Sequence, residues 1–274
     1  MYENYWGLTK KPFENTIDPK FLYFSKKHEE ALSRLAYAIR EKKGAALLTG
    51  VFGCGKTLLA QALLDELSQE KYKVVIINNP QLEYVELLSS IVCSLKAIEL
   101  PQKKSELSAV YFLKVLEQIL QNNLREGKET VIIIDEAHVI QDERVFEELR
   151  LLLNFQDRER FWLTLLLLGQ PELKQRIENI PQLEQRIAIK YHLDPLTLED
   201  TISYIVHRIK VAGRDETIFT REALESIYEY TGGIPRRINR LCDICLLAGF
   251  AKGSNQIDKS IVAEEAGGLG GVKA

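Results

Sequence analysis

Residues 47–60 read Leu-Leu-Thr-Gly-Val-Phe-Gly-Cys-Gly-Lys-Thr-Leu-Leu-Ala. Within this stretch a glycine, four further residues and then Gly-Lys-Thr form the pattern of a loop that binds phosphate groups. A short apolar run over residues 45–49 precedes the loop, and helical periodicity follows it over residues 58–68. A glycine turn without a ligand can arise by chance, but strand, loop and helix together favour a nucleoside triphosphate site.

The residue types in this loop match the chemistry of phosphate binding. Glycines leave room for backbone N–H groups to surround an anion, and the following helix directs its positive end toward the same point. Lys56 can reach the β- and γ-phosphates, and Thr57 can offer its hydroxyl to Mg²⁺. The residues expected to contact the nucleotide are Gly50, Gly53, Cys54, Gly55, Lys56, Thr57 and Leu58.

The composition is that of a globular protein with a full core. The chain has 274 residues, of which 46% are hydrophobic, and a net charge of -3, so no global field attracts nucleic acid or a membrane. Cys242 and Cys245 form a CxxC inside an apolar helical run, where buried thiols are favoured over a zinc site. The longest apolar stretch is too short to span a bilayer, and no signal peptide is apparent, so we expect a cytoplasmic protein.

Five short apolar runs alternate with helical patterns along the first two thirds of the chain. They cover residues 45–49, 73–78, 130–135, 161–168 and 187–193. Helices are expected near residues 26–40, 58–68, 82–97, 106–125 and 143–155, with a break around Pro101 and a further short helix opening at Gln170-Pro171. This alternation predicts an α/β fold, a P-loop NTPase with a five-stranded parallel sheet flanked by helices.

After residue 194 only helical patterns follow. They are expected near residues 197–212, 220–230 and 234–251, with a short helix after Asp258. We therefore expect a core over residues 26–194, a small all-helical domain over residues 195–266 and a flexible tail over residues 267–274. Residues 1–25 are aromatic and rich in turns, which suits either a strap packed on the core or a cover for a flat ligand such as adenine.

A second candidate motif, Val-Ile-Ile-Ile-Asp-Glu-Ala-His, covers residues 131–138. A buried strand that ends in Asp135 places a carboxylate where it can assist Mg²⁺. Glu136 is the adjacent acid that a hydrolase needs to activate a water molecule. A solvated acidic turn is the alternative. His138 fits a structural or capping role as well as a contact with the γ-phosphate.

Further candidates follow the later strands. Gln170 comes directly after a strand and can contact the γ-phosphate or the attacking water, or it can simply cap the next helix. Arg186 precedes the fifth strand, away from the chain's own phosphate loop, and is a candidate to act on a neighbouring subunit; Arg176 is its rival. Arg236 starts a helix of the second domain and can reach the phosphates if that domain closes as a lid, while Arg237 and Arg240 can form a small basic face.

Taken together, these motifs resemble an AAA+ ATPase, and more narrowly the ExeA type, general secretion pathway protein A. The resemblance covers nearly the whole length. It includes Tyr5-Trp6-Gly7-Leu8, Pro12-Phe13, Asp18-Pro19, Phe21-Leu22-Tyr23, Ser25 and His28-Glu29-Glu30-Ala31-Leu32 before the loop, and Leu48-Thr49-Gly50, Asp135-Glu136-Ala137-His138, Leu168-Gly169-Gln170-Pro171-Glu172-Leu173, Gln185-Arg186-Ile187 and Gly233-Ile234-Pro235-Arg236-Arg237-Ile238-Asn239 from there on.

This resemblance implies ATP and Mg²⁺ as cofactors, ATP hydrolysis, and a small helical lid domain of the AAA+ kind. By it, Lys56 and Thr57 bind phosphate and metal, Asp135 assists the metal and Glu136 activates water. Gln170 and Arg236 are the two sensors, and Arg186 is the finger that acts in trans. The resemblance also implies a homo-oligomer, ring or filament, in the ATP state, in the bacterial cytoplasm or peripheral to the inner membrane through a protein partner of an envelope or secretion complex.

Two departures from the family pattern widen the range of functions. The loop reads Gly-Val-Phe-Gly-Cys-Gly, where the family usually has an acid after the first glycine and Thr, Ala or Ser before the last. Secretion members also often continue into a membrane span and a peptidoglycan-binding domain, whereas this chain stops. The alternatives are therefore an ATPase that regulates DNA transposition and assembles on DNA, and a nucleotide-dependent scaffold with little turnover, against which Glu136 argues.

Overall fold

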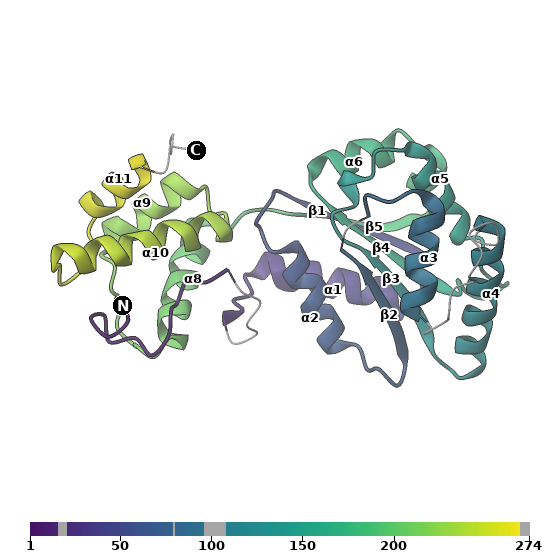
Figure 1. Ribbon diagram of the computed structural model, residues 1–274, viewed down its shortest axis with the longest axis horizontal. Coiled ribbons are helices and arrows are strands. Elements are labelled where there is room, and N and C mark those ends of the chain that lie inside the picture. Colours follow the sequence, from purple (N-terminus) through teal and green to yellow (C-terminus); the bar gives the residue numbers. More distant parts are fainter. Residues whose placement is uncertain (16–20, 79, 96–107, 269–274) are drawn as a thin grey trace. The chain divides into compact units, whose positions relative to one another are not determined.

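Five parallel strands form the centre of the larger of two compact units. The computed structural model describes residues 1–15, 21–78, 80–95 and 108–268 (Figure 1). Unit 1 comprises Met1–Lys27, Phe52–Gly55 and Asp194–Ala274, and unit 2 comprises His28–Val51 and Lys56–Leu193. The tip of the phosphate loop, Phe52–Gly55, is therefore part of unit 1, whereas the residues on either side of it, Val51 and Lys56, belong to unit 2.

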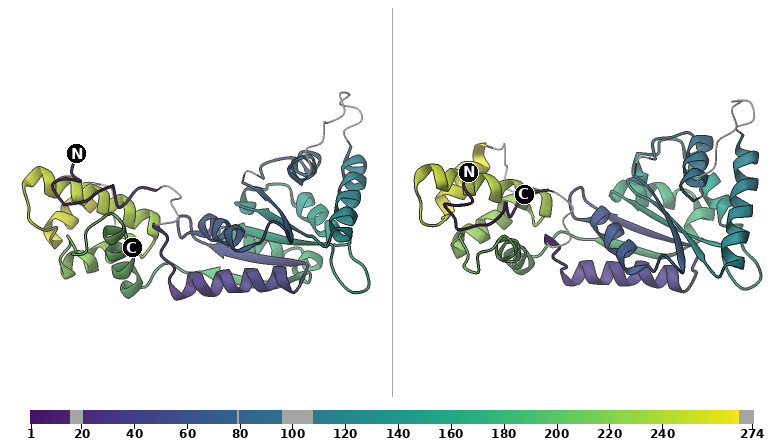
Figure 2. Two further views of the ribbon diagram at one scale, coloured as in Figure 1. Left: turned by 90° about the horizontal axis from the view of Figure 1, so that it is seen from below. Right: turned by 60° about the horizontal axis from the view of Figure 1, so that its bottom comes forward.

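The sheet of unit 2 is the predicted five-stranded parallel sheet. Its strands are β1 (Ala45–Gly50), β2 (Tyr72–Ile77), β3 (Glu129–Ile134), β4 (Leu163–Gly169) and β5 (Ile187–Leu193), in the order β2-β3-β4-β1-β5. Every neighbouring pair is parallel. All residues of β1 and β4 are buried, as expected for strands covered by helices on both faces (Figure 2).

Alternate residues of the strands enter one hydrophobic cluster. Leu47, Ile132 and Leu165 lie on the face that packs against the helices after β2 and β3. Because side chains alternate along a strand, Leu48, Ile133 and Leu166 lie on the opposite face, and they are fully buried too. Helix α2 packs on β1 and β4. This double burial fixes the central strands and therefore the positions at which they end.

The helices of unit 2 follow the predicted pattern with small differences at their ends. They are α1 (Lys26–Arg40), which begins at the end of unit 1, α2 (Lys56–Glu66), α3 (Tyr84–Leu95), α4 (Ala109–Arg125), α5 (Glu143–Leu152), α6 (Pro171–Glu178), the single turn α7 (Pro181–Glu184) and the short 3-10 turn η3 (Ala137–Val139). Helix α5 ends three residues before the expected Phe155, whose ring instead stacks on Trp162 at 6.3 Å. The sequence analysis did not predict η3 or α7, which are too short to show a period.

The described residues of unit 1 form four helices and the N-terminal segment. The helices are α8 (Leu198–Val211), α9 (Arg221–Thr231), α10 (Pro235–Lys252) and α11 (Lys259–Gly268). Thr197 and Thr220 cap α8 and α9 by accepting hydrogen bonds from backbone N–H groups three residues on. Helix α11 includes Gly267 and Gly268, which the sequence analysis assigned to the tail.

The N-terminal segment belongs to the core of unit 1. Trp6 is 1% exposed and its indole N–H donates to the carbonyl of Leu246 at 2.9 Å. Buried Arg208 donates to the carbonyls of Pro12, at 2.5 Å, and Glu14, at 2.8 Å, and its guanidinium lies 4.8 Å from the centre of the Phe21 ring. Segments at the two ends of the sequence therefore share one hydrophobic cluster.

Some predicted features lie outside the described residues. These are Asp18-Pro19 of the N-terminal signature, Asn79 after β2, the break around Pro101 with the adjoining helix ends, and residues 269–274 of the tail. Within the part of the chain that the structure describes, no helix combines the length and apolar character needed to cross a membrane.

Candidate nucleotide site

Three neighbouring strands of unit 2 end at the same edge of the sheet, and each is followed by a predicted site residue. The order β3-β4-β1 brings the end of β3, before Asp135, and the end of β4, before Gln170, beside the end of β1 at Gly50. The register pairs Ile134 with Leu167 and Thr49 with Gly169. The carboxyl edge of a parallel sheet is where ligands bind in such folds.

The loop after β1 has the backbone conformation that the glycine pattern predicts. Gly53 and Gly55 have φ angles of 84° and 105°, in the left-handed region that glycine adopts without a steric penalty. Between them the Cys54 side chain is fully buried, whereas Phe52 is 55% exposed. Helix α2 begins directly after the loop at Lys56, so its free N–H groups face the loop. Leu58 lies in the first turn of α2.

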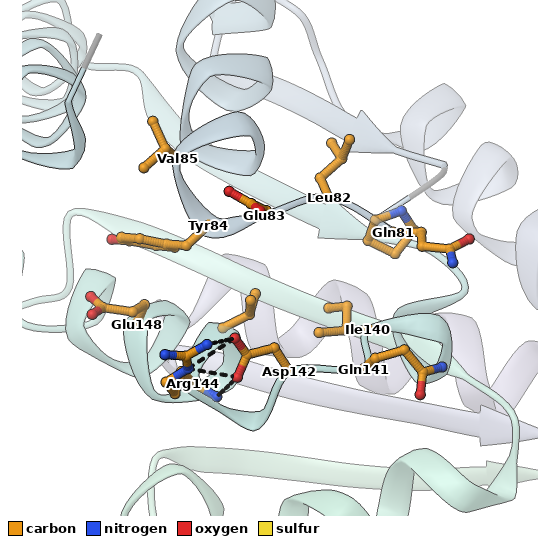
Figure 3. A pocket seen from close by; sticks show the side chains of 12 residues that line it. Gln81, Leu82, Glu83, Tyr84, Val85, Ile140, Gln141, Asp142, Arg144 and Glu148 are labelled. Atoms are coloured by element: carbon orange, nitrogen blue, oxygen red, sulfur yellow. Dashed lines mark hydrogen bonds and ion pairs between the residues drawn. The ribbon is translucent and has the colours of Figure 1, made fainter. Parts of the chain in front are cut away.

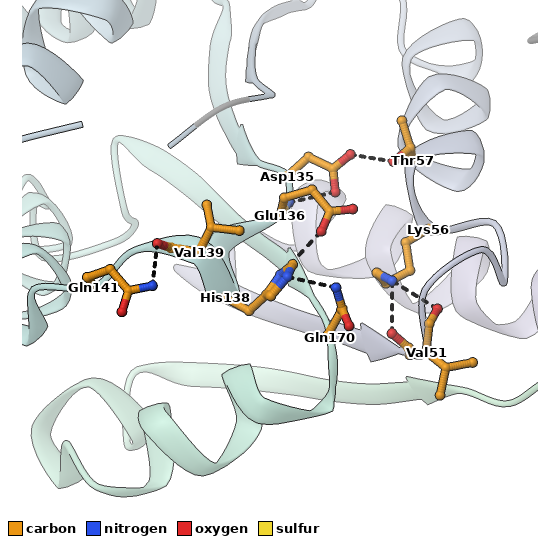
Figure 4. Close-up of polar contacts among 10 residues, drawn as sticks. Val51, Lys56, Thr57, Asp135, Glu136, His138, Val139, Gln141 and Gln170 are labelled. Carbon is orange, nitrogen blue, oxygen red and sulfur yellow. Dashed lines mark hydrogen bonds and ion pairs between the residues drawn. The ribbon is translucent and has the colours of Figure 1, made fainter. Parts of the chain in front are cut away.

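Lys56 is a buried ammonium group that bonds only to the loop in the part of the chain described. It is 4% exposed, and its Nζ donates to the carbonyls of Gly50, at 2.8 Å, and Val51, at 3.2 Å (Figure 4). An ammonium has three donor hydrogens, and a buried charge is costly without an opposite charge nearby. An anion bound at the loop satisfies both requirements.

Thr57 and Asp135 are joined across the site. The Thr57 hydroxyl donates to Oδ2 of Asp135 at 2.5 Å, and the backbone N–H of Glu136 donates to Oδ1 at 2.9 Å. Asp135 is 2% exposed. Hydroxyl and carboxylate oxygens are the donors that Mg²⁺ prefers, and it commonly keeps several water ligands as well. The pair therefore fits a magnesium ion held by few protein atoms.

Glu136, His138 and Gln170 form a second polar group beside this pair. Glu136 has φ 53°, and its Oε2 lies 3.2 Å from Nδ1 of His138. On the other side of the ring, Nε2 of His138 is 2.8 Å from Nε2 of Gln170 (Figure 4). Gln170 also occupies the N-cap position of α6, but its side chain makes no capping hydrogen bond. Its amide is thus turned toward His138.

The two arginines considered as fingers lie in different settings. Arg176, on α6, donates to the carbonyl of Ile140. Arg186 donates to Oδ1 of Asn154 at 3.4 Å and precedes β5, whose first residue pairs with Ala45 at the start of β1. Five residue steps of strand separate that end of β1 from Gly50, or about 17 Å. Arg186 is therefore remote from the phosphate loop of its own chain.

Arg236 contacts the tip of the phosphate loop within unit 1. Its backbone N–H donates to the carbonyl of Gly53 at 3.3 Å, and its guanidinium lies 4.7 Å from the centre of the Phe52 ring. A Cβ atom at Gly53 would lie 2.8 Å from Cβ of Arg236. The sequence analysis predicted Arg236 as a site residue, but no pattern indicated Phe52 as its partner.

A separate cavity of about 580 Å³ lies in unit 2 between the start of α3 and the start of α5 (Figure 3). It is lined by Pro80, Gln81, Leu82, Glu83, Tyr84, Val85, Ile140, Gln141, Asp142, Arg144, Val145 and Glu148. Burial, together with the Glu148 carboxylate, raises the pKa of Tyr84. None of the predicted nucleotide-site residues lines this cavity, and the sequence analysis assigned no function to its walls.

Comparison with known families agrees with this geometry. A model of the AAA domain family matches residues 39–177, about half of the chain, including the phosphate loop, Asp135 and Gln170. The chain belongs to the AAA domain family. The phosphate loop and the carboxylates of Asp135 and Glu136 thus lie within the part of the chain that the AAA family model matches.

Two curated proteins are similar to this AAA chain. General secretion pathway protein A of Aeromonas hydrophila is 40% identical over 275 residues, which cover 98% of the chain and 49% of that protein. An uncharacterized HTH-type transcriptional regulator of Methanocaldococcus jannaschii is 28% identical over 160 residues, 57% of the chain and 39% of the regulator. The chain spans about half or less of each relative. The resemblance to the general secretion pathway protein A type is confirmed.

Solved structures show the same AAA+ fold. The ORC2 protein of Aeropyrum pernix, solved as ADPNP-ADP complexes, has 21% identity and a TM-score of 0.68, covering 94% of this chain and 71% of that one. Drosophila ORC bound to DNA has 16% identity and a TM-score of 0.69, with coverages of 93% and 63%. A RuvB mutant of Thermotoga maritima has 20% identity and a TM-score of 0.58, with coverages of 89% and 68%.

Proposed function

We propose that this chain binds ATP with Mg²⁺, hydrolyses it to ADP and phosphate, and uses the ATP state to assemble into an oligomer that remodels a protein partner. The observation that carries the proposal is the direct contact of Thr57 with Asp135 at 2.5 Å, with Lys56 and Glu136 adjacent in sequence to the two. Membership of the AAA domain family and the ADPNP-ADP complexes of a structural neighbour support nucleotide binding.

Each of these residues has a defined task in the proposed reaction. Loop amides and the Lys56 ammonium bind the phosphates, and Glu136 orients and deprotonates the attacking water. Gln170 contacts the terminal phosphate or that water. Held by Thr57 and, through water, by Asp135, Mg²⁺ would neutralise charge on the phosphate oxygens. Arg236 and, from a neighbouring subunit, Arg186 neutralise the charge that develops during transfer.

Nucleotide binding is tested by Lys56→Ala. Because the substitution removes the buried ammonium, we expect ATP binding to fall below detection in calorimetry. Lys174→Ala is the matched control, since Lys174 forms an exposed ion pair with Glu178 at 3.8 Å. Wild-type affinity in Lys56→Ala would refute the phosphate-loop assignment.

Hydrolysis is tested separately by Glu136→Gln. The amide keeps the size of the side chain but cannot accept a proton from water, so we expect ATP binding to persist and turnover to fall on the order of 10²–10³-fold. Glu143→Gln, at the exposed start of α5, serves as the control. Phosphate release at the wild-type rate from Glu136→Gln would exclude Glu136 as the base. ATP binding without phosphate release by the wild type would instead favour a nucleotide-dependent scaffold.

The proposed biological role follows the curated relative. Identity of 40% over 98% of the chain supports a role like that of general secretion pathway protein A, on a partner of an envelope or secretion complex. We expect Glu136→Gln, trapped with ATP, to form a larger species than the ADP-bound protein in light scattering. Equal masses with ATP and ADP would contradict ATP-dependent assembly.

A second candidate is an ATPase that assembles on DNA. Arg237 and Arg240 are both exposed on α10, one turn apart. Affinity for duplex DNA that needs ATP and falls steeply with salt would favour this function. The net charge of -3 supplies no general attraction to DNA, so such binding would depend on this local face.

A further inference from the structure

His138 bridges two residues that have separate tasks in the proposed reaction. One ring nitrogen, Nε2, lies 2.8 Å from the amide nitrogen of Gln170, and the other, Nδ1, lies 3.2 Å from Oε2 of Glu136. The side chain of His138 is only 14% exposed, and that of Glu136 is 31% exposed. All three residues belong to unit 2, so their arrangement lies within one compact unit.

The chemistry of the contacts defines where the imidazole proton lies. An amide nitrogen of Gln170 can only donate a hydrogen bond, so the ring nitrogen that faces it must accept. A neutral imidazole then carries its hydrogen on Nδ1, the nitrogen that faces the Glu136 carboxylate. Nδ1 is buried and has no aligned hydrogen-bond partner among the described residues, so a small rotation of Glu136 would complete the bond.

The backbone fixes this arrangement from both sides. Glu136 has φ 53°, in the left-handed region, and this conformation is energetically unfavourable for a residue other than glycine. Glu136 is also the N-cap of the short turn η3, which contains His138. On the other side, Gly169 approaches that turn so closely that a Cβ atom would lie 3.2 Å from the backbone nitrogen of His138. The ends of β3 and β4 are therefore held together at the ring.

We propose that His138 is a positioning residue that couples Gln170 to Glu136. Through its two nitrogens, a displacement of the Gln170 amide is passed to the Glu136 carboxylate, so the group that orients water responds to the group that contacts the terminal phosphate. This coupling rests on the proposed function, because it assigns Glu136 to the attacking water. His138 itself touches neither nucleotide nor water in this scheme.

The first test compares His138→Ala, Gln170→Ala and the double variant. We expect the ATP dissociation constant of His138→Ala to stay within about twofold of wild type and kcat to fall on the order of 10–100-fold, as when supporting partners of functional groups are removed. The double variant should be no slower than the slower single variant, because both break one coupled path. Multiplied losses, or an unchanged kcat in His138→Ala, would overturn the proposal.

Matched variants separate coupling from a general loss of structure. Gln141→Ala, five residues after Glu136 and two residues after the end of η3, removes a side-chain hydrogen bond to the carbonyl of Val139 and should leave kcat unchanged. His138→Asn places an N–H near the position of Nδ1 and should recover part of the lost kcat, because the side toward Glu136 is restored. A loss that Asn does not reduce, together with a lowered melting temperature, would assign His138 a structural role only.

A second readout does not depend on hydrolysis. In the nucleotide-free protein, nitrogen chemical shifts of the imidazole report which ring atom is protonated, and the chain has only four histidines. We expect His138 to carry its hydrogen on Nδ1 and to lose that preference in Gln170→Ala. A hydrogen on Nε2 in the wild type would overturn the coupling. If ATP hydrolysis itself is absent, the proposed function fails, and this spectrum still decides whether the bridge exists.

Discussion

Gly53 and Gly127 have similar backbone angles, so substituting each of them distinguishes the effect of backbone strain from that of a steric clash. Gly53 has φ 84°, and a Cβ atom there would lie 2.8 Å from Cβ of Arg236, whereas Gly127 has φ 71° and nothing within 4 Å of such an atom. Each substitution by alanine should cost about 1–2 kcal/mol from the left-handed backbone alone. Of these two positions, only Gly53, in the phosphate loop, would add a steric clash, with Arg236.

We therefore expect Gly53→Ala to lower ATP affinity at least about tenfold by displacing the loop, and Gly127→Ala to keep wild-type affinity while lowering the denaturation midpoint. Calorimetry with ATP and urea unfolding measure the two effects. Equal ATP affinity in both variants would show that the contact with Arg236 does not restrain the loop.

At this scale the sequence predicts residues whose chemistry is tied to a fixed spacing. Lys56 and Thr57 follow their glycines, and Asp135 follows an apolar strand, so one linear pattern locates each of them. The contact of His138 with Gln170 could not be located in this way, because Gln170 follows another strand. That contact depends on β4 lying beside β3, which no local pattern encodes.

At the scale of elements, Arg208 on α8 holds the N-terminal segment. Its guanidinium is buried, donates to the carbonyls of Pro12 and Glu14 and lies over the Phe21 ring. Hydrogen bonds that involve a charged group contribute about 1.5–3 kcal/mol, so Arg208→Ala should destabilise unit 1 by roughly that amount.

The measurement can be confined to unit 1. In a Trp162→Phe background, fluorescence reports Trp6 alone, and Arg208→Ala should shift its unfolding midpoint to lower urea. Arg221→Ala removes an exposed ion pair with Glu225 on α9 and should change stability by less than about 1 kcal/mol. If the two variants unfold alike, Arg208 does not hold the segment.

The CxxC of helix α10 gives a prediction about thiol reactivity. Burial raises the pKa of Cys245 to about 12, and burial also raises the pKa of Cys242. Both thiols are therefore neutral near pH 7.5, and the thiolate that reacts forms only as the pH approaches these raised values. A disulfide reagent should label half-exposed Cys93 first, and it should label Cys242 and Cys245 only after unfolding. Rapid labelling that survives when both Cys54 and Cys93 are replaced by serine would show that α10 opens readily.

Elements were predictable where burial leaves a continuous signal. The strands β1 and β4 are buried on both faces and appear in the sequence as unbroken apolar runs. The early end of α5 was not predictable, because Phe155 continues the helical period but packs on Trp162 instead. The order of the strands was not predictable either, because strands that are neighbours in the sheet, such as β1 and β4, are far apart in the sequence.

At the scale of the whole molecule, the position of Arg186 bears on assembly. It precedes β5 at the edge of the sheet opposite the phosphate loop, with Asn154 as its hydrogen-bond partner. If it serves a neighbouring subunit, Arg186→Ala should bind ATP normally yet hydrolyse it poorly alone. Mixing this variant with Lys56→Ala should restore part of the activity, because some interfaces then combine an intact loop with an intact arginine.

The control for this mixture is Arg176→Ala combined with Lys56→Ala. Arg176 is bonded to the carbonyl of Ile140 within its own unit, so no recovery on mixing is expected. Recovery with Arg176→Ala and none with Arg186→Ala would exchange their roles. Phosphate release measured across mixing ratios distinguishes the two results.

The pairing of Trp6 with Leu246 also has a consequence for biosynthesis. The two residues are separated by 240 positions, and ribosomes add about 5–20 residues per second, so the indole waits roughly 10–50 s for its carbonyl to emerge. During this time the aromatic N-terminal segment is exposed, because the helices that bury it have not yet been synthesised, whereas residues 28–193 can already fold. Holdase chaperones that recognise exposed aromatic segments should therefore bind ribosome-attached chains arrested before α10 and release those arrested after it.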